Sequence, residues 1–77
     1  MWTEANGYLT RDFEFESFRA AFDFMTSVSF IAEELNHHPE WSNVYNKVTI
    51  ALTTHDEGNT VTQVDRDFAK ACDSLLA

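Results

Sequence analysis

Two of the three histidines in this chain stand side by side, at His37 and His38, and the only proline, Pro39, follows them directly. The third, His55, lies further along, just before an Asp-Glu-Gly run. Histidine has an ordinary pKa of about 6.5, so it can donate and accept protons near neutral pH. Glu33 precedes His37 by four residues and could hydrogen-bond to it across one helical turn. The residue types therefore suit acid–base catalysis.

Spacing alone leaves other interpretations of the histidines open. Adjacent histidines after a helix can simply be polar loop residues, and spacing favours this interpretation about as much as a catalytic one. A three-histidine zinc site is less favoured, because neighbouring residues such as His37 and His38 tend to point apart and no cysteine adds a ligand. A serine hydrolase is weaker still, because no serine lies in a nucleophile-elbow pattern.

The strands that must position these residues follow from the alternation of apolar side chains. Met1–Glu4 and Tyr8–Phe15 predict two strands joined by a turn at Asn6-Gly7. The core face of the second strand would carry Leu9, Arg11, Phe13 and Phe15. Ser42–Thr54 also alternates and predicts a strand that could break near Asn46-Lys47. Its core face would carry Val44, Val48, Ile50 and Leu52.

Two segments have helical spacing instead. Ser17–Asn36 predicts a helix with Ser17 as N-cap, and Pro39 forces an end shortly before it. The expected buried stripe is Phe18, Ala21, Phe22, Met25, Val28, Ile31, Ala32 and Leu35. A second helix should begin after Thr62, where Asp65 three residues later resembles a capping box. This helix is expected to bury Phe68, Ala69, Cys72, Leu75 and Leu76.

The chain is expected to form one small acidic α+β domain over residues 1–77, with both helices covering one sheet face. Its 13 acidic and 5 basic residues give a net charge of −8 without any Lys/Arg cluster, which argues against nucleic acid and anionic membranes as partners. A single cysteine, Cys72, forms no internal disulfide, and its spacing indicates a core residue rather than a reactive thiol. Without a membrane-spanning apolar run or a signal pattern, a cytoplasmic location is expected.

Three further residues near the histidine pattern have simple structural interpretations. Trp41 and Tyr45 are favoured as partly buried packing aromatics over residues that stack on a ligand. Asp65 is favoured as a first-turn carboxylate stabilised by the helix dipole over a residue with a direct chemical role.

The pattern E-x-x-x-H-H-P-x-x-x-x-x-Y, followed by His and then Asp, is matched by Glu33, His37, His38, Pro39, Tyr45, His55 and Asp65. Similar runs surround it, namely FEFESFRAAFDFM, EWSNVYNKVTIALTTH and VDRDFAKAC. From Trp2 to the C-terminus, the chain thus resembles the pterin-4a-carbinolamine dehydratases. The resemblance implies a four-stranded antiparallel sheet with helices on one side, without the N-terminal helix that many members carry.

The resemblance also implies a reaction and an assembly. Family members remove water from 4a-hydroxytetrahydrobiopterin, which aromatic amino acid hydroxylases release, and form quinonoid dihydrobiopterin without a metal or bound cofactor. Subunits pair edge to edge, and dimers associate further through helices, so a homodimer or a dimer of dimers is expected. The alternative is a non-catalytic member that acts as an interaction, assembly or transcriptional coactivator protein.

The family's site residues would fall at defined positions of this chain. His37 and His55 would be general acids that protonate the departing hydroxyl, each suited to one stereoisomer, and His38 would bind and orient the pterin ring. The substrate-binding and supporting set would be Glu33, Asn36, Pro39, Thr53, Thr54 and Asp65. Asn36 stands where many members have Asp, and Pro39 would stop the helix so that both neighbouring imidazoles enter one pocket.

Overall fold

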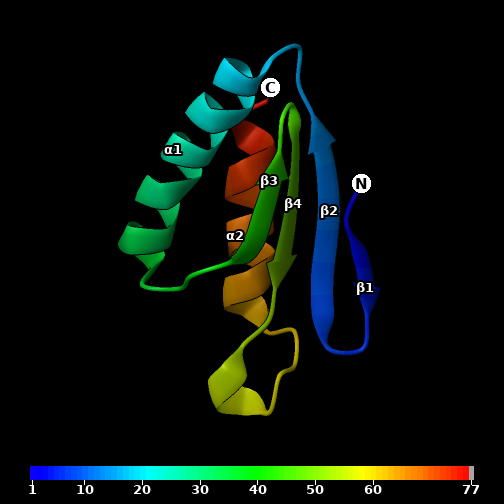
Figure 1. Cartoon of the computed structure of the whole chain (residues 1–77). Coiled ribbons are helices and arrows are strands. Elements are labelled where there is room, and N and C mark those ends of the chain that lie inside the picture. Colours follow the sequence, from blue (N-terminus) through cyan, green and yellow to red (C-terminus); the bar gives the residue numbers. More distant parts are fainter. Residues whose placement is uncertain (77) are drawn as a thin grey trace.

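The computed structural model describes residues 1–76, which form a four-stranded antiparallel sheet with two helices on one side (Figure 1). The strands are β1 (Thr3–Ala5), β2 (Tyr8–Glu14), β3 (Glu40–Val44) and β4 (Lys47–Leu52), in the spatial order β1-β2-β4-β3. The helices are α1 (Phe18–Leu35) and α2 (Gln63–Ser74), with a short 3₁₀ turn, η1 (His55–Glu57), before α2. The predicted α+β class and antiparallel sheet are confirmed.

The hydrophobic core lies between the sheet and the two helices. Its buried members are Leu9, Phe13, Ala21, Phe24, Val28, Ala32, Val48, Ile50, Leu52, Phe68, Ala69 and Cys72. Burial raises the pKa of the Cys72 thiol to about 12, and the neighbouring Asp73 carboxylate acts in the same direction. Because a thiol must ionise to react, Cys72 is an inert core residue, as its spacing predicts.

The segment predicted as one strand, Ser42–Thr54, is a hairpin of β3 and β4 that turns at Tyr45 and Asn46. The possible break near Asn46 is therefore confirmed, but the expected burial of Val44 is wrong, because 73% of this residue is exposed. A two-residue turn pairs even-numbered residues of β4 with odd-numbered residues of β3, as in Ile50 with Trp41. Val44 thus falls on the opposite face from Ile50.

Both helices begin where their capping residues predict. The Ser17 hydroxyl accepts a hydrogen bond from the Ala20 N–H at 3.1 Å, and the predicted capping box of Thr62 and Asp65 is formed at the start of α2. Two details of burial are wrong. Phe18 and Phe22 are half exposed at the edge of the α1 stripe, whereas Phe24, outside the predicted stripe, is buried. Leu75 and Leu76 follow the end of α2 and are 42% and 46% exposed.

Arg11 lies on the core face of β2, where its charge needs a partner. Its guanidinium group forms an ion pair with Asp73 of α2 at 2.7 Å and lies 4.5 Å from the centre of the Phe13 ring. The Trp2 indole N–H also donates to the Asp73 carboxylate, at 2.9 Å. These contacts attach the C-terminal half of α2 to the sheet.

The opposite end of the molecule brings three chain segments together. The last turn of α1, the end of β4 with η1, and the first turn of α2 all lie in the lower half of Figure 1. Each segment carries at least one member of the histidine and carboxylate pattern, so the fold gathers residues far apart in sequence. Within residues 1–76, no helix is both long and apolar enough to cross a membrane.

Candidate active site

His37 is held by a buried carboxylate at the start of α2. Its Nε2 atom lies 2.5 Å from Oδ1 of Asp65, and the two side chains are 15% and 0% exposed. The His37 ring also meets the buried Phe68 ring nearly edge-on, with centroids 6.3 Å apart. Because an ionised carboxylate only accepts hydrogen bonds, Nε2 of His37 carries the hydrogen and Nδ1 remains for other partners.

Asp65 satisfies its charge with hydrogen bonds from three directions. Its Oδ2 accepts from the Thr54 hydroxyl at 2.7 Å and from the Thr62 backbone N–H at 2.9 Å, while Oδ1 faces His37. Burial alone raises the pKa of this carboxyl group. The hydrogen bonds from Thr62, Thr54 and His37, with the His37 charge, outweigh burial and hold the pKa of Asp65 below its ordinary value. Asp65 is therefore an ionised anchor, beyond its role as a helix cap.

His38 is exposed and contacts a different carboxylate. Its Nε2 atom lies 2.8 Å from Oε2 of Glu33, and both side chains are largely exposed. The expectation that Glu33 orients His37 is wrong, because Asn36 ends the helix in a left-handed conformation with φ 50°. The backbone N–H of His37 then bonds back to Ala32 at 3.0 Å. This cap takes His37 away from the helical row that contains Glu33.

His55 opens the short η1 turn and is exposed. Its Nδ1 atom lies 2.8 Å from Oδ1 of Asn59, an oxygen that can only accept, so Nδ1 carries a hydrogen. Its Nε2 atom lies 3.5 Å from Oε2 of Glu40, the first residue of β3. Neither Asn59 nor Glu40 was expected in the site. Asn59 could have been found by its place one turn after His55, and Glu40 by its place immediately after Pro39.

A cavity of about 200 Å³ lies between the histidines. It is lined by Asn36, His37, His38, Thr54, His55 and Asp56. Of the other residues expected in the site, the buried Asp65 contacts His37 and the exposed Glu33 contacts His38, but neither lines the cavity. Pro39 is not among the lining residues and connects His38 to β3. Asp56 lines the cavity although sequence reasoning gave it no role, and its position next to His55 was the available signal.

Thr53, which was expected to line the pocket, is instead buried in the fold. Its hydroxyl donates to the Gly7 carbonyl at 2.7 Å. Gly7 has a φ of +84°, and a Cβ atom there would lie 2.0 Å from the backbone oxygen of Asn59. The β1–β2 turn therefore supports the loop that carries the partner of His55, and Thr53 acts on the site only through this contact.

The two aromatic residues near the histidines lie outside the cavity. Trp41 lines a shallow hollow with Phe22 and Met25 of α1 and is 36% exposed, which agrees with a partly buried aromatic residue. Tyr45 occupies the β3–β4 turn with a φ of 51° and is 65% exposed. The expectation of a partly buried packing residue is therefore wrong for Tyr45.

The nitrogen and oxygen atoms of the site are largely paired with one another. Among residues 1–76, no three His, Cys, Asp or Glu side chains are close enough together to hold a metal ion. His37 already directs Nε2 to Asp65, and His38 directs Nε2 to Glu33. The site presents imidazoles paired with carboxylates around a cavity, which is an arrangement suited to proton transfer.

The relationship to known proteins is decided by a match over almost the whole chain. The family model described as Pterin 4 alpha carbinolamine dehydratase matches residues 1–75. The chain belongs to the pterin-4a-carbinolamine dehydratase family. A relative from Solibacter usitatus is 51% identical over 76 residues, which cover 99% of this chain and 79% of the relative. One from Prochlorococcus marinus is 49% identical over 74 residues, 96% of this chain and 76% of the relative.

Solved structures agree with the pterin-4a-carbinolamine dehydratase fold. A Brucella melitensis protein described as a transcriptional coactivator/pterin dehydratase superposes with a TM-score of 0.92 at 41% identity, covering 99% of this chain and 82% of that chain. A pterin dehydratase-like protein described as a RuBisCO assembly factor superposes with a TM-score of 0.78 at 22% identity, covering 97% and 86%. The second likeness concerns the fold alone. Both curated relatives carry the dehydratase name provisionally.

Proposed function

We propose that this pterin-4a-carbinolamine dehydratase family member is an active enzyme that converts 4a-hydroxytetrahydropterin to quinonoid dihydropterin and water. The observation that carries the proposal is the cavity lined by three histidines, one of which is fixed by the buried, ionised Asp65. The buried Asp65 carboxylate contacts His37, whose side chain is itself mostly buried, beside the cavity. A buried histidine–carboxylate pair beside a cavity favours a functional site over polar loop residues.

The proposed reaction uses one proton donor and one proton acceptor. The carbon–oxygen bond of the carbinolamine breaks while an imidazolium of His37 or His55 protonates the departing hydroxyl, which leaves as water. The hydrogen on the neighbouring ring nitrogen is lost as a proton, and its electron pair forms the new carbon–nitrogen double bond. Protonation is needed because hydroxide is a poor leaving group at neutral pH. No oxidant or reductant enters the balance.

The other site residues have supporting roles in this proposal. His38, exposed beside the cavity and paired with Glu33, binds and orients the pterin ring. Thr54 and Asn36 line the same cavity, and Asp65 fixes the protonated nitrogen of His37. The substrate would come from a pterin-dependent hydroxylase, so the reaction would recycle tetrahydrobiopterin.

The test of the proposal is an absorbance assay with chemically prepared 4a-hydroxytetrahydropterin. We expect the wild-type chain to accelerate dehydration above the spontaneous rate in proportion to protein concentration. We expect His38→Ala to raise KM for both stereoisomers about tenfold, the magnitude of one lost hydrogen bond to a charged group. The variant with all three histidines replaced by alanine is the control for non-specific acceleration. A wild-type rate equal to that of this variant would contradict the proposal.

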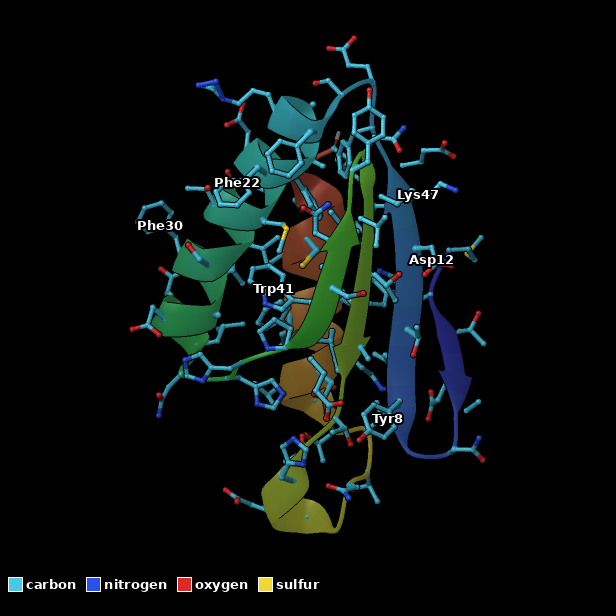
Figure 2. All side chains as sticks on the ribbon, in the orientation of Figure 1. Tyr8, Asp12, Phe22, Phe30, Trp41 and Lys47 are labelled. Atoms are coloured by element: carbon cyan, nitrogen blue, oxygen red, sulfur yellow. The ribbon has the colours of Figure 1, made fainter. Side chains whose placement is uncertain are left out.

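A binding role without catalysis is the second candidate, and exposed aromatic residues favour it. Figure 2 shows Phe30 on the outer side of α1 and Phe22 further up the same helix, and they are 71% and 51% exposed. The Brucella relative is described partly as a transcriptional coactivator. The dehydration assay discriminates between the two roles, because a binding protein would show no acceleration.

The same aromatic residues support a homo-oligomer, in which a second copy covers α1 or pairs with the sheet edge at β3. We expect light scattering to give a multiple of the 8.9 kDa chain mass. We expect Phe30→Ser to lower the mass by one association step, because it removes the most exposed phenylalanine of α1. Ser29→Ala on the same helix is the matched control. A wild-type mass of one chain would contradict the expectation.

A further inference from the structure

A tyrosine and a glutamate form a chain of contacts that ends at His55. The Tyr8 hydroxyl donates a hydrogen bond to Oε2 of Glu40 at 3.1 Å, and the same oxygen lies 3.5 Å from Nε2 of His55. Tyr8 stands at the lower end of β2, with its ring directed toward β4 (Figure 2). Neither Tyr8 nor Glu40 lines the cavity, and the proposed function gives them no role.

The register of the sheet explains how these side chains meet. Ala51 of β4 pairs with Thr10 of β2 on one side and with Glu40 of β3 on the other. Cross-strand partners share a face, so Glu40, Ala51, Thr10 and therefore Tyr8 all lie on the face away from the helices. The small Ala51 side chain leaves the space between β2 and β3 open. Tyr8 can thus reach diagonally across β4 to the Glu40 carboxylate.

We propose that Glu40 is a positioning residue for His55 and that Tyr8 holds Glu40 in place. The inference rests on the proposed function, in which His55 is a general acid. Asn59 accepts the hydrogen of Nδ1, so Nε2 is the nitrogen that carries the transferable proton. Glu40 lies on the side of Nε2 and attracts the imidazolium electrostatically. At 3.5 Å the contact is too long to be a strong hydrogen bond, so the Nε2 proton stays available to a substrate.

The state of Tyr8 suits this supporting role. Its hydrogen bond to Glu40 is the main cause that raises the pKa of Tyr8, and desolvation and the Glu40 charge act in the same direction. Tyr8 is therefore protonated at neutral pH and donates its hydroxyl hydrogen to Glu40. His37 has the buried Asp65 as its anchor, so each proposed acid has its own carboxylate.

The test compares Glu40→Gln with the wild-type full chain, because this change removes the charge and keeps the side-chain size. We first identify the stereoisomer whose dehydration is slowed more by His55→Ala. For this stereoisomer, we expect Glu40→Gln to lower kcat about two- to fivefold, the range for an exposed ion pair. KM and the turnover of the other stereoisomer should not change. Tyr8→Phe should cause a smaller loss in the same direction. In the His55→Ala background, Glu40→Gln should have no further effect.

A second readout does not depend on catalysis. In proton–carbon NMR spectra, Glu40→Gln should move the His55 ring signals and leave those of His37 unchanged. If the wild-type chain shows no turnover, the proposed function fails. The His55 ring signals then still show whether Glu40 contacts His55. Unchanged His55 signals in Glu40→Gln, or equal losses for both stereoisomers, would overturn the inference.

Discussion

Replacing His37 by alanine is expected to lower kcat for one stereoisomer of 4a-hydroxytetrahydropterin about 100-fold or more, the lower end of what a positioned general acid contributes. His37 lines the cavity, is only 15% exposed, and has its ring fixed between Asp65 and Phe68. A loosely held water cannot replace a proton donor with this orientation. The measurement is kcat for each stereoisomer separately, followed by absorbance.

Two variants make this prediction specific. His55→Ala is expected to show the opposite stereoisomer preference, because His55 reaches the cavity from η1 rather than from the end of α1. Glu34→Gln, an exposed change beside the histidine pair, should leave both rates unchanged. Wild-type kcat for both stereoisomers in His37→Ala would remove His37 from the role of acid.

The sequence was most informative where local chemistry decides the structure. The start of α1 follows from the Ser17 cap, and its end follows from Pro39 a few residues later, which cannot continue a helix. Both signals lie within one or two helical turns of the helix end that they determine. The three histidines line one cavity, and the signal that the sequence offered is that each of them follows or precedes a regular element. The burial errors at Val44, Phe18 and Phe22 arose because alternation and helical spacing do not show where a hairpin turns or which neighbour covers a stripe.

The partners of the histidines could not be deduced from spacing. Glu33 precedes His37 by one helical turn, but the helix ends at the left-handed Asn36 cap before it reaches His37. Glu33 therefore contacts His38 instead. Asp65 reaches His37 only because the fold brings the start of α2 next to the end of α1. One pairing depends on the local conformation of the Asn36 cap and the other on tertiary packing, so the spacing in the sequence could not show which carboxylate contacts which histidine.

Removing the Asp65 carboxylate is expected to cause the largest loss of stability of any change at the site. Asp65→Ala should lower the free energy of unfolding by about 3–5 kcal/mol, because it leaves the His37 ring N–H, the Thr62 N–H and the Thr54 hydroxyl without this buried acceptor. This is a large share of the roughly 5–15 kcal/mol that stabilises a small domain. Asp65→Asn keeps the size and one acceptor and should cost about 2 kcal/mol.

The stabilising contribution of Asp65 should also depend on pH and be lost in acid. Because the folded-state pKa of Asp65 lies below its ordinary value, its ionisation stabilises the fold fully above the unfolded pKa of about 4, and the contribution is lost as the pH falls through the folded pKa. Urea unfolding of the wild type and of Asp65→Asn should therefore differ at pH 7 and converge in acid. Asp67→Asn, exposed on the same helix, should change stability by less than about 0.5 kcal/mol at either pH. Equal stability of Asp65→Asn and the wild type at pH 7 would show that Asp65 is not the ionised anchor of His37.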